Sequence, residues 1–173
     1  MQRAIIATIL LVGLLQMGCS PEFNWRDTAL PPTPLHGLFP CKPDTAVRSV
    51  VLAGQSLELH MTSCSTAGVT TAIGHADLPS ADKSGPVLQQ WRQASLKTMA
   101  ARSVVERPLV LAGIRNEPEA VQVQAIGTGP NGAPLDFRAV WFTRQSTAFV
   151  AMVFGEKLRA DAAETFLSGL RLQ

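Results

Sequence analysis

The chain has 173 residues, with 15 Lys and Arg against 13 Asp and Glu, and its formal net charge is +2. This nearly neutral balance, without a basic stripe, argues against a nucleic-acid partner and against a polybasic membrane-binding patch. Hydrophobic residues make up 46% of the sequence, which is long enough for one domain with a buried core.

Residues 1–18 are predicted to be a cleaved export signal. Arg3 is the only charge before the apolar run over residues 4–15, which is as long as a signal-peptide core and too short to span a bilayer. Gly18 before Cys19 resembles the lipobox of bacterial lipoproteins, although Gln16 stands where an aliphatic residue is usual. We therefore expect lipidation at Cys19; an ordinary cleaved signal peptide and an uncleaved anchor are the alternatives. By the bacterial sorting rule, Ser20 after the cysteine indicates the outer membrane.

The next segment, residues 19–38, contains four prolines and almost no hydrophobic period. This composition predicts an extended, lipidated, proline-rich tether between the membrane and the domain. Phe23 and Trp25 are apolar exceptions that could dock back on the domain. Residues 39–173 are expected to form a single α+β domain.

Two cysteines, Cys41 and Cys64, remain once Cys19 carries lipid. They would lie in an oxidising compartment, where disulfides persist, and two cysteines allow only one intramolecular pairing. Closing this loop of about 24 residues would stabilise the fold by roughly 3 kcal/mol. Two buried free thiols are the alternative, and the lack of a Cys-x-x-Cys pair argues against a cysteine metal site.

Strands are expected in the first half of the domain. Residues 47–52 read as a strand that ends in a turn at residues 53–55. Residues 57–62 alternate apolar and polar side chains, which is the period of a half-buried strand: Leu57, Leu59 and Met61 against Glu58, His60 and Thr62. Residues 65–68 are predicted to be a hairpin loop, and residues 69–78 the returning strand.

A helix is expected in the middle of the chain, after a loop over residues 79–85. Pro86 suits the first turn of a helix, and one stripe at helical spacing follows it, formed by Val87, Leu88, Trp91, Ala94, Ser95 and Met99. This stripe should pack on the sheet as core. A ligand or partner groove along it is the alternative.

Further strands are expected over residues 104–114, 120–127 and 135–143, with a turn at Pro130-Asn131-Gly132 before the last of them. The long apolar run over residues 147–154 is expected to be a central strand. Asp161 to Glu164 matches a capping box that opens a closing helix, in which Phe166, Leu167 and Leu170 are buried. The expected order of elements is strands, a helix, further strands and a closing helix. This order predicts an α+β fold, in which helices cover the faces of an antiparallel sheet.

Several motifs resemble a family of small uncharacterised lipoproteins of proteobacteria, mainly of the beta subdivision. They are Asn24-Trp25-Arg26, Phe39-Pro40-Cys41-Lys42-Pro43, Leu52-Ala53-Gly54, Cys64, Trp91-Arg92, Gly129-Pro130-Asn131-Gly132, Phe166 and Leu170. The resemblance implies Cys19 as the anchor and Cys41 with Cys64 as a pair, and it supplies no catalytic residue. More distantly, the order of elements is similar to the PsbP-like fold of the photosystem II extrinsic subunit. That likeness implies a curved antiparallel sheet and a binding or assembly role.

One polar cluster is a candidate metal site. If the hairpin loop has four residues, Cys64 lies opposite Val69 and Glu58 opposite His75, with His60 and Asp77 on the same face. Two histidines and two carboxylates could bind Zn²⁺ or Cu²⁺. Because Leu57, Leu59 and Met61 should face the core, a simple solvated sheet face is the expected interpretation.

Catalysis finds little support in the sequence. There is no Gly-x-Ser-x-Gly elbow, and only three histidines, His36, His60 and His75, are available to a hydrolase. Gly127-Thr128-Gly129 lacks the helix that a phosphate-binding loop needs. We therefore expect a non-enzymatic, lipid-anchored envelope protein on the periplasmic face of the outer membrane, without a cofactor, that binds or stabilises another envelope protein. A metal-binding module is the alternative, and a hydrolase is a weaker one.

Overall fold

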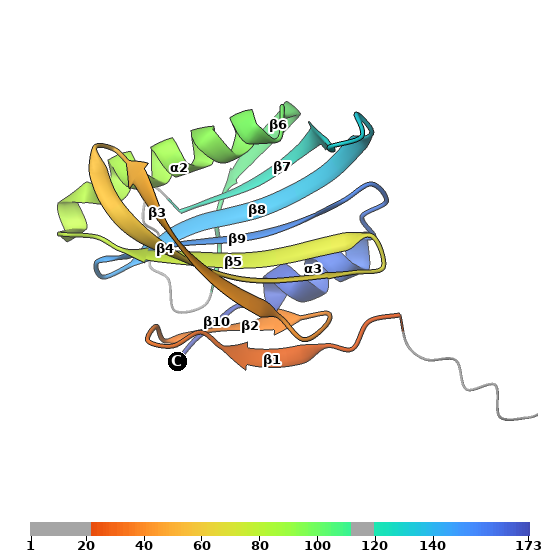
Figure 1. The fold of residues 1–173 in the computed structure, drawn as a ribbon, viewed down its shortest axis with the longest axis horizontal. Coiled ribbons are helices and arrows are strands. Elements are labelled where there is room, and N and C mark those ends of the chain that lie inside the picture. The colour runs from red at the N-terminus through yellow and green to blue at the C-terminus, as the bar shows by residue number, and fades with distance from the viewer. Residues whose placement is uncertain (1–21, 112–119) are drawn as a thin grey trace, which may run out of the picture.

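The computed structural model describes residues 22–111 and 120–173. In this part of the chain it is an α+β protein with two antiparallel sheets and two α-helices (Figure 1). The elements, in chain order, are β1 (Arg26–Ala29), β2 (Leu35–Phe39), β3 (Asp44–Leu52), β4 (Gln55–Thr66), β5 (Val69–Asp77), the 3-10 helix η2 (Ala81–Lys83), α2 (Ser84–Thr98), β6 (Arg102–Pro108), β7 (Val121–Thr128), β8 (Pro134–Arg144), β9 (Thr147–Gly155), α3 (Ala160–Ser168) and β10 (Arg171–Leu172).

The larger sheet has seven strands in the order β3-β4-β5-β9-β8-β7-β6. The long apolar strand β9 is its middle strand, as its composition predicts, and pairs with β5 on one side and β8 on the other. Neighbouring strands that follow each other in sequence are joined by hairpins, whereas the β5-β9 pair joins distant parts of the chain. The expected strands and the mid-chain helix are therefore present. Of the strand expected over residues 104–114, β6 ends at Pro108, residues 109–111 are not part of a strand, and residues 112–114 lie outside the described residues.

Helix α2 covers one face of the larger sheet. Val87, Leu88 and Trp91 on its predicted stripe are buried there, against side chains of the strands beneath it. Gly74 permits this close approach: a Cβ at that position would lie 3.2 Å from Cζ2 of Trp91 and 3.0 Å from Cγ1 of Val150. The prediction of a core-facing stripe is confirmed for the first half of the helix.

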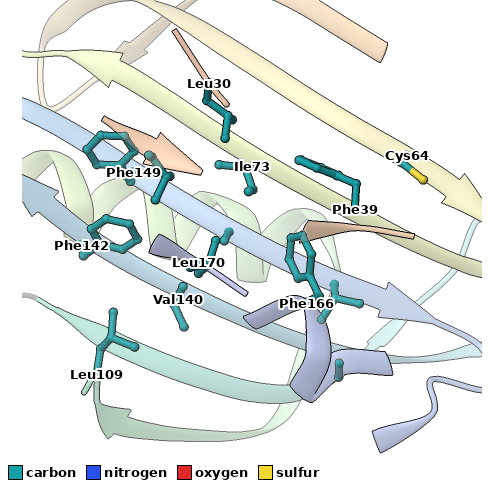
Figure 2. Close-up of a cluster of buried hydrophobic side chains, with 14 of the residues drawn as sticks. Leu30, Phe39, Cys64, Ile73, Leu109, Val140, Phe142, Phe149, Phe166 and Leu170 are labelled. Atoms are coloured by element: carbon teal, nitrogen blue, oxygen red, sulfur yellow. The ribbon is translucent and has the colours of Figure 1, made fainter. Parts of the chain in front are cut away.

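The opposite face is covered by α3 and by a three-stranded sheet in the order β1-β2-β10 (Figure 1). Figure 2 shows the apolar cluster between these layers. Within it, the rings of Phe39 and Phe166 meet edge to face, with centroids 5.9 Å apart. The rings of Phe142 and Phe149 stack with centroids 5.0 Å apart. The fold is thus a sheet with a hydrophobic core on each face.

The expected tether is wrong for the described residues up to residue 38. Strands β1 and β2 pair with each other over residues 26–39, and β2 also pairs with the C-terminal strand β10. Leu35 and Phe39 are fully buried, and Phe23 and Trp25 pack against the same cluster. The prolines that suggested a tether lie mainly in the turn between β1 and β2, and the partner strand β10 comes from the far end of the sequence.

The turn between β4 and β5 is shorter than predicted. Ala67 and Gly68 have φ angles of 49° and 73°, which is the left-handed conformation of a two-residue hairpin turn. Cys64 therefore lies opposite Thr71, not Val69. The shift by two residues keeps every side chain on its predicted face but changes its partner, because the side-chain period of a strand is two.

The capping box at Asp161 and Glu164 is also wrong. Helix α3 begins at Ala160, with Arg159 as its N-cap and no side-chain cap hydrogen bond. The carboxylate of Asp161 instead accepts hydrogen bonds from the Arg159 guanidinium, one of them 3.0 Å long from Nε. The same guanidinium reaches Glu22 at 2.9 Å. Asp161 does accept a 2.9 Å hydrogen bond from the backbone N–H of Ala162, but it lies inside the first turn of the helix and not at its N-cap.

Candidate functional site

The most unusual surface of the protein is the outer edge of β3. All nine residues of this strand pair with β4 on one side, and no described strand pairs with the other side. Eight of the nine residues are at least partly exposed, and Val47 and Val51 are 55% and 66% exposed. In an antiparallel pair, every second residue directs its backbone N–H and C=O groups away from the partner strand. The edge of β3 therefore presents free donors and acceptors to another extended segment.

The opposite edge of the same sheet, β6, is shaped differently. Its register with β7 shifts between Arg102 and Val105, and Ser103 has a φ of 53°. The strand ends in Pro108 and also carries Glu106. Bulges, charges and proline are the devices by which natural proteins block edge-to-edge pairing. Strand β3 carries Asp44 and Arg48 but has no proline and no register shift, so its edge stays regular over nine residues, whereas the edge of β6 is interrupted.

An apolar groove lies beside β3, on the face that α2 covers. Its volume is about 450 Å³, and most of its lining side chains are apolar. The lining comes from β3, β4, α2, β8 and β9: Val50, Val51, Leu52, Leu59, Trp91, Ala94, Ser95, Thr98, Met99, Phe137, Met152 and Phe154. The second half of the α2 stripe thus borders a groove, which was the alternative interpretation of that stripe. A groove of this size and composition can hold apolar side chains or a small apolar ligand.

The structure brings together only part of the predicted metal cluster. His60 lies directly opposite His75, and their rings stack with centroids 4.9 Å apart. Asp77 is exposed at the end of β5 and accepts a 2.8 Å hydrogen bond from Oγ1 of Thr147, and Glu58 is exposed. Within residues 22–111 and 120–173, no three His, Cys, Asp or Glu side chains are grouped so that they could hold a metal ion.

The expectation of a solvated sheet face around these histidines is wrong for His75. This residue is only 5% exposed, and its ring centroid lies 6.2 Å from that of Phe149. Burial, and secondarily the charge of His60, lower the pKa of His75, while Asp77 acts in the opposite direction. The closing helix α3 was expected, but the small sheet β1-β2-β10 that covers this face together with it was not.

Cys41 and Cys64 form a disulfide, with their Cα atoms 5.9 Å apart. Cys41 follows β2 and Cys64 lies in β4, so the bond links the small sheet to the large one.

His36, the third histidine, lies in β2 with Nδ1 3.4 Å from Oδ1 of Asp27. Cys19 falls outside the described residues.

Comparison with models of known protein families finds no match, and no curated protein matches the chain either. None of the helices in the described ranges combines the length and the apolar character needed to cross a bilayer.

The edge of β3 and the groove beside it are the features from which a function is argued below. The strand itself was predicted from residues 47–52, which include three valines, but the sequence did not show that one side of this strand has no described partner.

Proposed function

We propose that the protein is a lipid-anchored binding or assembly module of the outer membrane, which holds an envelope partner by β-strand addition at β3. The observation that carries this proposal is the regular, unpaired nine-residue edge of β3, in a sheet whose other edge is bulged and ends in a proline. In strand addition, backbone hydrogen bonds provide affinity, and side-chain pockets provide specificity.

The groove supplies such a pocket. Val50, Val51 and Leu52 belong to both the edge strand and the groove lining. Alternate side chains of an added strand would point to the α2 side of the sheet, next to Val50 and Leu52, while the others would lie beside exposed Val47 and Val51 on the opposite face. A partner segment with apolar residues at alternate positions therefore suits both faces of the edge.

The charge of β3 favours a different protein over a second copy of this chain. Arg48 is the middle residue of the strand, and it makes no ion pair with another described residue. Full antiparallel pairing of two β3 strands would place Arg48 opposite Arg48 of the second copy, and like charges directly opposite each other are destabilising. A partner strand with an acidic residue at this position would gain an ion pair instead.

Anchoring through Cys19 would keep this edge close to the membrane. Strand β1 begins at Arg26, so residues 20–25 link the anchor to the fold and span at most about 20 Å. The resemblance to small lipoproteins of proteobacteria supports the anchor. The more distant likeness to the curved sheet of the PsbP-like fold supports a binding or assembly role, since proteins with that fold mostly act in this way.

Strand addition is tested with designed peptides and the purified full chain. Two peptides that match the nine residues of β3 in length alternate Thr and Val, and carry either Glu or Lys at the middle position. Fluorescence anisotropy should show binding of the Glu peptide, roughly tenfold tighter than that of the Lys peptide. The V47K/V51K double variant should lose this binding.

A matched control is available on the other edge. Val104 and Val105 of β6 are 40% and 48% exposed, so V104K/V105K introduces the same charge and should leave peptide binding unchanged. Equal loss in both double variants, or equal binding of both peptides, would contradict the proposal. A dimer in analytical ultracentrifugation that dissociates in V47K/V51K would make a second copy the occupant and overturn the envelope-partner assignment.

The anchor is tested separately by labelling cells with palmitate. The parent chain should incorporate the label, and Cys19→Ala should neither incorporate it nor fractionate with the outer membrane. A Cys19→Ala form that fractionates and matures like the parent would refute the anchor and leave the strand-addition test unaffected.

A further inference from the structure

A second pocket lies near the protected edge of the large sheet, away from β3. Its volume is about 350 Å³, which is at the lower end of the range for small-molecule sites. Side chains from β6, β7 and β8 line it together with one residue that precedes α3: Ser103, Val105, Arg107, Gln124, Ala125, Ile126, Asp136, Phe137, Arg138 and Leu158.

The strand register places hydrogen-bond donors around the middle of this pocket. Gln124 on β7 lies directly opposite Arg138 on β8 and Val105 on β6. Arg107 is two residues beyond Val105 and therefore points to the same face. Two arginine side chains, whose guanidinium groups each have five N–H donors and no acceptor, thus line the same pocket as Gln124 from the strands on either side of β7.

The bulge in β6 contributes to the same pocket. Between Arg102 and Val105 the register with β7 shifts, and Ser103 takes a φ of 53° in that stretch. Bulges change the direction of a side chain relative to the regular strand, and Ser103 lines the pocket together with the two arginines. The bulge that interrupts the edge of β6 therefore also contributes a polar side chain to this pocket.

The two arginines are not neutralised by the protein. Arg92, Arg159 and Arg171 each form an ion pair, with N–O distances of 3.4, 2.9 and 2.5 Å. Among the described residues, neither Arg107 nor Arg138 forms one. Asp136 lines the same pocket but forms no ion pair with either guanidinium. A concave surface with an excess of positive charge concentrates anions.

Apolar side chains complete the lining. Val105 and Ile126 are 48% and 37% exposed, and half-buried Leu158 borders them from the segment before α3. A free inorganic anion would leave this apolar surface in contact with water, whereas an anion that carries a short hydrocarbon portion would cover it.

We propose that this pocket binds a phosphate or carboxylate group that is attached to an aliphatic portion, with Arg107 and Arg138 as its charged ligands. Guanidinium groups bind such oxyanions through paired, charge-assisted hydrogen bonds. Gln124 and Ser103 add neutral donors, and Val105, Ile126 and Leu158 contact the aliphatic portion. A membrane lipid headgroup and a soluble acyl or alkyl anion share this chemistry. The site does not involve β3, so it is independent of the proposed strand addition.

Calorimetric titration of the full chain with octyl phosphate, octanoate, inorganic phosphate and octanol tests the proposal. Octyl phosphate and octanoate should bind, and inorganic phosphate and octanol should each bind at least about tenfold more weakly. Binding of octyl phosphate should weaken as the salt concentration rises, because salt screens the contact between charges. Vesicles of phosphatidylglycerol, with phosphatidylcholine as reference, distinguish the two sources: competition with octyl phosphate identifies a lipid headgroup, and its absence a soluble anion.

The R107Q/R138Q double variant should bind octyl phosphate at least about tenfold more weakly than the parent chain. Neither arginine is buried, so the variant should keep the parent's melting temperature and circular dichroism spectrum. R102Q is the matched control, since Arg102 belongs to the same strand and does not line the pocket, and it should bind normally. Unchanged binding in R107Q/R138Q, equal loss in R102Q, or octanol binding as tight as that of octyl phosphate would overturn the proposal.

Discussion

The imidazole ring of His75 stacks on that of His60, with the ring planes 7° apart and the centroids 4.9 Å apart. The two residues face each other across strands β4 and β5, and His75 is almost completely buried. A charged imidazolium at this position would be poorly solvated and would also be repelled by a protonated His60. The pair therefore couples the stability of the fold to pH.

We expect the free energy of unfolding to decrease on acidification, in part because of His75. The native pKa of His75 is lowered from 6.5 by burial and by His60, so between these two pKa values the unfolded chain binds more protons than the folded chain. The stabilisation that neutral His75 provides is fully present above pH 6.5. It is lost as the pH falls from 6.5 towards the pKa of His75 in the folded state. Urea denaturation at a series of pH values from 8 to 5 measures this loss.

The matched variants for this prediction are His75→Gln and His36→Gln. His75→Gln should show a shallower decrease of stability over the same pH range, whereas His36→Gln, in the small sheet, should retain the parent's decrease at the His75 step. An identical slope in His75→Gln and in the parent chain would show that His75 does not contribute.

Reduction of the Cys41–Cys64 disulfide should lower the free energy of unfolding by about 3 kcal/mol, because the bond closes a loop in the unfolded chain. The two cysteines are 23 positions apart. Denaturation of the C41S/C64S double variant and of the reduced parent chain provides the measurement. A difference below about 1 kcal/mol would contradict the chain-entropy argument for this bond.

Phe39→Ala should destabilise the protein by about 3 kcal/mol or more, as other large deletions in a core do. Phe39 of β2 is fully buried and contacts Phe166 of α3. Val110→Ala is the control, since Val110 is 89% exposed, and it should change stability by less than about 0.5 kcal/mol. Similar denaturation midpoints for both variants would mean that β2 is not part of the cooperative fold.

Gly155→Ala should lower the free energy of unfolding by about 1–3 kcal/mol, because it forces a Cβ into closely packed backbone. This Cβ would lie 2.5 Å from the carbonyl oxygen of Gly68 in the β4-β5 turn. Gly129→Ala is the milder comparison, since its nearest neighbour would be the side-chain oxygen of Asn131 at 3.1 Å. Thermal unfolding of the two variants should rank Gly155→Ala as the less stable, and the reverse order would contradict the argument.

Much of the larger sheet could be predicted from local patterns. The alternation over residues 57–62 indicated which side of β4 faces α2, and Leu57 is indeed buried on that side. The stripe from Val87 to Trp91 indicated the buried face of α2. Side-chain periodicity reports burial directly, because it depends only on the geometry of one strand or one helix.

Errors arose where the outcome depended on distant parts of the chain. The segment with β1 and β2 was interpreted as a tether, because its strand partner β10 is separated from it by most of the sequence. For the same reason, the face around His75 was expected to be solvated. The capping box was wrong because the helix begins at Ala160, which places Asp161 inside the first turn, where its carboxylate bonds the Arg159 guanidinium as well as the Ala162 N–H.

By itself, the sequence determined the α+β class, the burial pattern of the middle strands and of α2, and the expectation that Cys41 pairs with Cys64. The tertiary structure alone decided that β3 has an open edge beside a groove and that Arg107 and Arg138 converge on one pocket. Local periods show which side chains are buried. The order in which strands pair, and the side chains that meet across them, follow from the packing free energy of the whole core, to which residues far apart in sequence contribute together.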